Sequence, residues 1–170
     1  MSPEAGSASL RGVPTYIAVC GPDPALPEIA DQAETTGRLL ARAGAVLVCG
    51  GLGGVMDAAA RGCEAEGGTS IGILPGFSRD AASPHATYTI PTGIGEMRNA
   101  LVVRAADAVI AIAGEFGTLS EIAFALKTET PVIGLGTWDL AKGGRPATPY
   151  PQVETPEQAV AEALRLAGSR

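Results

Sequence analysis

The sequence predicts an α/β protein, with a doubly wound, mainly parallel sheet and helices on both faces. Apolar runs of strand length alternate with helix-periodic segments along the chain, and glycine turns follow several of the runs. Strands that alternate with helices at this spacing pair in parallel, because each helix carries the chain back across the sheet. The predicted fold is therefore Rossmann-like.

The chain has 170 residues, of which 46% are hydrophobic, which is enough for one buried core. We therefore expect a single domain over residues 13–170. The segment 1–12 is too polar for a signal peptide, and we expect it to form a mobile tail. No apolar run is long enough for a transmembrane helix.

The first part of the predicted sheet is marked by glycine and proline breaks. The apolar run 15–20 is the first strand, and helical periodicity over 28–43 follows a proline-containing loop. The second strand, 45–49, leads directly into the glycine loop 50–54. A helix then continues to about residue 66.

The middle of the chain predicts a third strand over 70–74, which proline and glycine end. Residues 77–87 show no periodicity, and we expect a surface loop there. A short strand over 88–90 and a helix over 95–105 precede the central strand, 107–113.

In the last part of the chain, Thr118 opens a helix that runs to about residue 128. A strand over 131–135 follows, and then a loop rich in glycine and proline over 136–149. An edge strand over 150–153 and a final helix over 156–167 end the predicted fold. Trp138, in that loop, can cover the site or cap the core, and we expect it to cap the core.

The junction at residues 107–125 reads as strand, glycine loop and helix. At such a junction in a parallel sheet, the loop amides and the helix N-terminus present partial positive charge to a ligand. We therefore expect an anion site here. Thr118 and Glu121 also fit a capping box, in which each side chain satisfies an amide at the helix start, so helix capping and a role in the site both stay open for Glu121.

Charge and motifs narrow the class of ligand. The formal net charge of −6, without a basic run, argues against nucleic acid and favours a small ligand. The glycine loop 50–54 departs from the dinucleotide fingerprint, so a structural turn and a ligand-binding loop both remain open. The sequence contains no Gly-Lys-Ser or Gly-Lys-Thr motif, which excludes the common loop that binds nucleoside triphosphates. Three cysteines without paired spacing indicate reduced thiols in the cytoplasm and no metal site.

Three motifs in order resemble the LONELY GUY (LOG) superfamily, also called possible lysine decarboxylases. Residues 113–121, AGEFGTLSE, resemble its Pro-Gly-Gly-x-Gly-Thr-x-x-Glu signature, residues 51–56 resemble its glycine loop, and residues 97–99, MRN, fall where its Arg-Lys pair occurs. The resemblance covers about residues 15–135. The short chain looks most like the branch that includes molybdenum cofactor carrier proteins.

The resemblance implies hydrolysis of the N-glycosidic bond of a nucleoside 5′-monophosphate, with Arg98 and Glu121 as catalytic residues and no cofactor or metal required. A carboxylate suits this reaction because positive charge builds on the ribose as the bond breaks. The implied phosphate and ligand contacts are Gly21, Gly51, Gly53, Gly54, Met97, Asn99, Gly114, Gly117 and Thr118. The family also implies a homodimer.

Two departures from the family pattern favour an alternative function. Glu115 replaces a glycine of the signature, where a carboxylate repels phosphate unless it points away, and Asn99 replaces the lysine. The alternative is a carrier that binds the molybdenum cofactor, a phosphorylated pterin, without turnover.

Decarboxylation of lysine is not expected. A pyridoxal phosphate enzyme needs a lysine for its Schiff base, and only Lys127, late in a helix, and Lys142, in a loop, are available.

Overall fold

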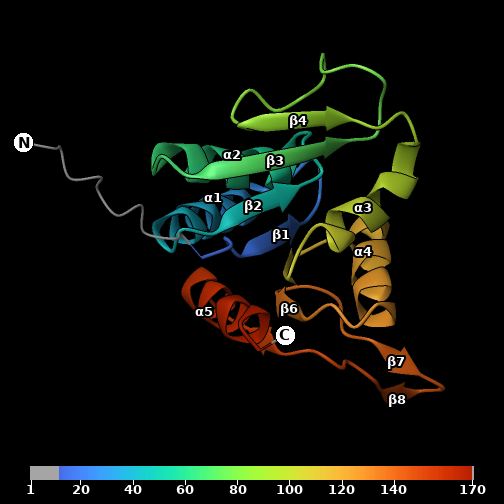
Figure 1. The fold of residues 1–170 in the computed structure, drawn as a ribbon. Coiled ribbons are helices and arrows are strands. Elements are labelled where there is room, and N and C mark those ends of the chain that lie inside the picture. The colour runs from blue at the N-terminus through green and yellow to red at the C-terminus, as the bar shows by residue number, and fades with distance from the viewer. Residues whose placement is uncertain (1–11, 170) are drawn as a thin grey trace, which may run out of the picture.

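The computed structural model describes residues 12–169, and its main feature is a seven-stranded parallel sheet with the order β4-β3-β2-β1-β5-β6-β9 (Figure 1). Residues 1–11 of the predicted tail lie outside this range. The strands of the sheet are β1 (Tyr16–Cys20), β2 (Val46–Cys49), β3 (Thr69–Leu74), β4 (Tyr88–Pro91), β5 (Ala108–Ile112), β6 (Val132–Leu135) and β9 (Gln152–Val153).

Helices cover both faces of the sheet, which confirms the doubly wound α/β prediction. On one face lie α1 (Pro27–Arg42), α2 (Gly54–Ala65) and α5 (Pro156–Ala167), and on the other lie α3 (Asn99–Arg104) and α4 (Phe116–Lys127). Successive strand residues point to opposite faces. In β5, Ile110 accordingly packs in the core under α1, α2 and α5, while Val109 packs in the core under α3 and α4.

The order of the strands places a switch point between β1 and β5. The chain winds outward from β1 through β2 and β3 to β4, and then returns to pair β5 with the free side of β1. Ligands of open parallel sheets bind outside the carboxyl ends of the strands at such a point, because the connections leave on opposite sides and open a crevice.

Several boundaries differ from the prediction. The helix expected over 95–105 begins as a 3-10 turn, η1 (Gly95–Arg98), before α3 continues it. The loop expected over 136–149 contains an antiparallel pair, β7 (Ala141–Lys142) and β8 (Arg145–Pro146). This pair is exposed, so no apolar alternation marks it in the sequence.

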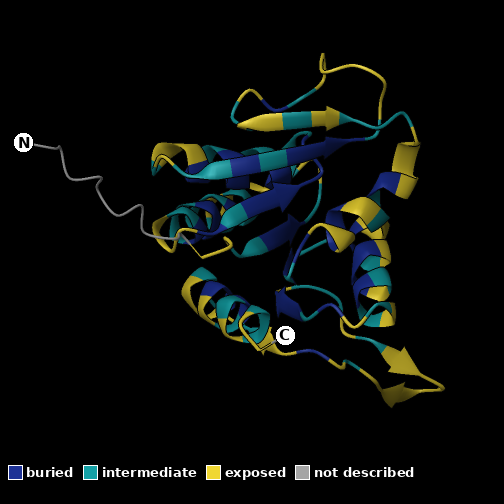
Figure 2. Cartoon of the chain, in the orientation of Figure 1, coloured by how far each residue is buried: buried dark blue, intermediate teal, exposed yellow. Residues whose placement is uncertain are grey.

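Burial follows the layered arrangement. The central strands are buried on both faces, whereas β4 at the sheet edge and the β7–β8 pair are largely exposed (Figure 2). Among the residues that the structure describes, no helix has the length and apolar character needed to span a membrane.

Candidate functional site

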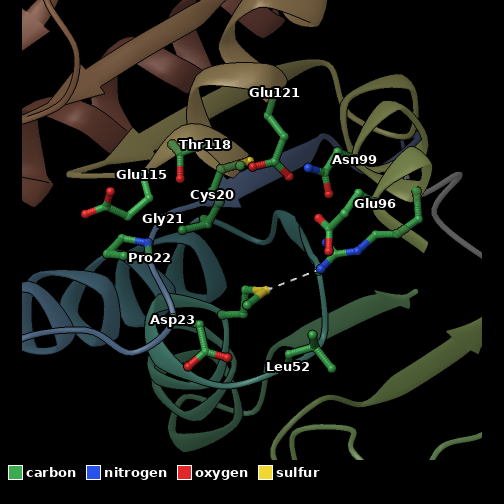
Figure 3. A pocket seen from close by; sticks show the side chains of 15 residues that line it. Cys20, Gly21, Pro22, Asp23, Leu52, Glu96, Asn99, Glu115, Thr118 and Glu121 are labelled. Carbon is green, nitrogen blue, oxygen red and sulfur yellow. Dashed lines mark hydrogen bonds between the residues drawn. The ribbon is translucent and has the colours of Figure 1, made fainter. Parts of the chain in front are cut away.

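A cavity of about 300 Å³ lies at the carboxyl ends of β1 and β5, at the switch point of the sheet (Figure 3). We call it the Arg98 cavity. Its walls come from the segments after β1, β2 and β5, from α2, and from η1 with the start of α3. The lining residues are Val19, Cys20, Gly21, Pro22, Asp23, Gly50, Leu52, Met56, Glu96, Arg98, Asn99, Glu115, Gly117, Thr118 and Glu121.

The N-terminus of α4 forms one wall of the cavity. The helix begins at Phe116 with Glu115 as its N-cap, and no side chain caps it. Thr118 therefore lies within the first turn, and the capping-box interpretation of Thr118 and Glu121 is wrong. Because first-turn amides lack partners within a helix, this end of α4 offers them, and its positive dipole end, to an anion.

The loop before α4 has an unusual backbone. Ala113 has a φ of 48°, which is uncommon for a residue with a side chain, and Gly114 follows with a φ of 124°. A Cβ at Gly114 would lie 2.6 Å from the Thr118 side chain. Glycine at this position therefore lets the loop fold closely over the helix start.

Arg98 is buried in this cavity without a carboxylate partner. Its side chain is 6% exposed, Nη2 lies 4.0 Å from the sulfur of Met56, and Nε has no hydrogen-bond partner. The guanidinium passes against Gly50, where a Cβ would lie 1.8 Å from Nη1. A buried cationic donor without a partner is costly, so it indicates a position that an anionic ligand completes.

Glu121 lies on α4, lines the same cavity as Arg98 and is 7% exposed (Figure 3). Burial raises its pKa to about 7, while a hydrogen bond from Cys20 and the positive charge of Arg98 act in the opposite direction. Burial and the neighbouring Glu121 carboxyl together raise the pKa of Cys20 well above its usual value. Near neutral pH the cavity therefore holds a carboxyl poised between its two protonation states and a protonated thiol.

Six of the residues that the sequence predicted for the site line this cavity: Gly21, Arg98, Asn99, Gly117, Thr118 and Glu121. Asn99 also donates from Nδ2 to Oγ of Ser120 over 3.1 Å, which ties α3 to α4.

The other five predicted residues lie outside the cavity walls. Gly51 and Gly54 have positive φ angles, of 73° and 58°, and shape the turn between β2 and α2. The amide of Gly53 donates to Asp23 over 3.2 Å. The side chain of Met97 is 76% exposed, and Gly114 lines a neighbouring cavity.

Sequence reasoning missed several lining residues. Gly50 belongs to the predicted glycine loop, but nothing in the sequence shows that this glycine, rather than its neighbours, contacts Arg98. Asp23 stands in the loop after β1, where a residue at the carboxyl end of a central strand is a fair candidate. Leu52 and Met56 lie in the motif 51–56, but they were not predicted as site residues because apolar side chains near a helix start usually belong to the core.

No group of three or more His, Cys, Asp or Glu side chains suited to a metal ion occurs within residues 12–169. The three cysteines are free and buried.

A parallel sheet with a cavity at its switch point, against an uncapped helix N-terminus, defines the Rossmann-like class of proteins. Residues 14–162 match the model of the SLOG cluster4 family. The chain therefore belongs to this family, within the LOG-like superfamily, which confirms the resemblance.

Known relatives agree with this assignment. An uncharacterised protein of Archaeoglobus fulgidus is 41% identical over 128 residues, which are 75% of this chain and 80% of that protein. The molybdenum cofactor binding protein of the phototrophic bacterium Rippkaea orientalis is 34% identical, with a TM-score of 0.82 over 93% of this chain and 99% of its own. The molybdenum cofactor carrier protein of Chlamydomonas reinhardtii is 28% identical, with a TM-score of 0.80 over 93% of this chain and 100% of its own.

Proposed function

We propose that this protein binds a small phosphorylated ligand in the Arg98 cavity and acts as a carrier of the molybdenum cofactor, a phosphorylated pterin. The fold, the family and two similar structures of molybdenum cofactor binding and carrier proteins support this class of ligand. This was the alternative in the sequence interpretation, and these comparisons favour it over hydrolysis of nucleotides.

The observation that carries the proposal is the buried guanidinium of Arg98, whose Nε has no partner. A phosphate suits this position because a guanidinium binds it through two parallel hydrogen bonds. The amides at the start of α4, near Gly117 and Thr118, add donors on the opposite wall. When bound, the cofactor supplies the redox-active metal, and this chain's residues hold its phosphate.

The proposal is tested by calorimetric titration of the protein with isolated molybdenum cofactor under anaerobic conditions. We expect saturable binding by wild type and binding roughly 10- to 100-fold weaker by Arg98→Met, since a hydrogen bond to a charged group contributes about 1.5–3 kcal/mol. Arg104→Met, an exposed position on α3, is the matched control and retains wild-type affinity. Absence of saturable binding by wild type would remove the carrier function.

A second candidate function is phosphoribohydrolase activity, which the pair of Glu121 and Arg98 favours. A carboxyl with a pKa of about 7 can either stabilise the positive ribose or transfer a proton at neutral pH. Incubation with a panel of nucleoside 5′-monophosphates, followed by chromatography of released base, tests it. Release by wild type and its loss in Glu121→Gln would establish hydrolysis, and a background rate in both proteins would exclude it for that panel.

We further propose a homodimer in the cytoplasm. Ile94, Met97 and Leu101, on and beside the element that carries Arg98, are exposed apolar side chains that a second copy would cover. The free thiols agree with a reducing compartment. Analytical ultracentrifugation tests the dimer, and a monomer at all concentrations measured would contradict it.

A further inference from the structure

A second cavity, of about 520 Å³, adjoins the Arg98 cavity and is lined by the loop that precedes α4. Pro22 and Glu115 line both cavities. The second cavity has both polar and apolar walls, and Leu26, Ile29 and Trp138 contribute apolar side chains to them. Because the two cavities share these residues, one ligand can place an anionic group in the first and a planar ring in the second.

Trp138 presents a fixed aromatic surface to the second cavity. Its Nε1 donates to the carbonyl of Glu115 over 3.3 Å, and its ring centroid lies 5.6 Å from that of Phe116. The sequence left two positions open for Trp138, over the site or against the core, and favoured the core. Trp138 does pack against the core under α4, and it also lines this cavity. An indole held in this position is suited to contact with a planar ring.

Glu115 is the only ionisable side chain among the residues that line the second cavity. Its carboxylate points away from the Glu121 side chain (Figure 3). The other polar side chain in these walls, Thr137, donates its hydroxyl to the carbonyl of Ala113. Glu115 is therefore the hydrogen-bonding side chain that the cavity offers to a ligand.

A carboxylate accepts hydrogen bonds and donates none. A ring edge with two neighbouring N–H donors matches the two oxygens of the carboxylate. Guanine and pterin share such an edge, because both contain a 2-amino-4-oxopyrimidine ring. Adenine instead presents a ring-nitrogen acceptor at the corresponding edge, which a carboxylate repels. Hypoxanthine keeps the ring N–H but lacks the amino group.

We infer that the second cavity is the ring subsite of the ligand, and that Glu115 selects a 2-amino-4-oxo ring, of the guanine or pterin class. This inference rests on the proposed function, in which the phosphate of the same ligand binds at Arg98. It also gives a role to the residue that departs from the family signature. In the family's pattern a glycine stands there, which would leave this edge of a ring without an acceptor.

The test uses GMP, IMP and AMP as probes, which share ribose and phosphate and differ in the ring edge. By calorimetry, we expect wild type to bind GMP about tenfold more tightly than IMP, the effect of one hydrogen bond to a charged group, and to bind AMP more weakly than either. Emission of Trp138, the single tryptophan of the chain, should change on GMP binding, because the ring enters the cavity that it lines.

Glu115→Gln separates ring recognition from phosphate binding. Glu115 is exposed, so the variant is expected to fold, to lose the preference for GMP over IMP, and to bind orthophosphate at least as tightly as wild type. The ring subsite would be overturned if wild type bound the three nucleotides with equal affinity and Trp138 emission did not change. If phosphate binding still depended on Arg98 in that case, the proposed function would stand. Failure of wild type to bind any of these phosphates would overturn both.

Discussion

The guanidinium of Arg98 lies directly against the backbone of Gly50, so closely that a Cβ at Gly50 would fall 1.8 Å from Nη1. These residues are far apart in sequence and meet because the turn after β2 and the 3-10 turn before α3 both reach the carboxyl edge of the sheet. Gly50 therefore positions Arg98 by leaving space for it.

Gly50→Ala is expected to displace Arg98 and to weaken ligand binding about as much as Arg98→Met, by roughly 10- to 100-fold. The added methyl group meets the end of a flexible side chain, so the arginine moves while the fold is kept. Calorimetry measures the affinity, and circular dichroism checks the fold. Gly76→Ala is the control, since a Cβ there would have no neighbour within 4 Å. If Gly50→Ala bound the ligand with wild-type affinity, the space that Gly50 leaves for the Arg98 side chain would not be needed for binding.

Glu121→Gln is expected to change how stability depends on pH. Burial raises the pKa of Glu121 to about 7 from 4.5, so between these values the folded protein holds a proton that the unfolded chain has released. The stability that this group contributes is present below about pH 4.5 and is lost as the pH rises through 7.

Relative to wild type, the glutamine variant should therefore gain roughly 3 kcal/mol of unfolding free energy between pH 4.5 and pH 8. Urea denaturation at these pH values measures the difference, with the exposed Glu157→Gln as the control. Parallel pH profiles for wild type and Glu121→Gln would contradict the account of a buried carboxyl.

The three cysteines should resist thiol reagents in the folded protein. All are buried, and burial raises the pKa values of Cys49 and Cys63 to about 11 and that of Cys20 well above its usual range, so few thiolates form at pH 8. A colorimetric thiol assay should show slow reaction in buffer and rapid reaction of all three in denaturant. Fast native labelling of one cysteine would identify an accessible thiolate.

Ile110→Ala tests the central strand as the core of the fold. Ile110 is fully buried in β5, and its truncation is expected to cost about 2–5 kcal/mol of unfolding free energy. The matched control is Ile90→Ala, on the half-exposed edge strand β4, which should cost less than about 1 kcal/mol. Equal losses in chemical denaturation would contradict this difference in packing.

Local sequence patterns predicted most of the fold because burial in a parallel sheet requires them. The run that ends in Cys20 and the central run around Ile110 are apolar throughout, since each strand faces a helical layer on both sides. The β7–β8 pair escaped prediction because its residues are exposed and short, so no core constrains their pattern.

The candidate site was less predictable, because its geometry depends on contacts between distant segments. Thr118 has the chemistry of an N-cap, yet α4 starts two residues earlier, at Phe116, with its first turn uncapped. Arg98 and Glu121 were found through their motifs. Their burial, the contact of Arg98 with Gly50, and the orientation of Glu115 follow from the tertiary fold.

A crystal structure with a pterin monophosphate bound would show whether the Arg98 cavity holds the phosphate of a pterin-type ligand. We expect phosphate oxygens within hydrogen-bond distance of the Arg98 guanidinium and of the amides at Gly117 and Thr118, with the ring in the second cavity, which Trp138 and Glu115 line. A phosphate bound elsewhere, with Arg98 left without an anionic partner, would contradict this expectation.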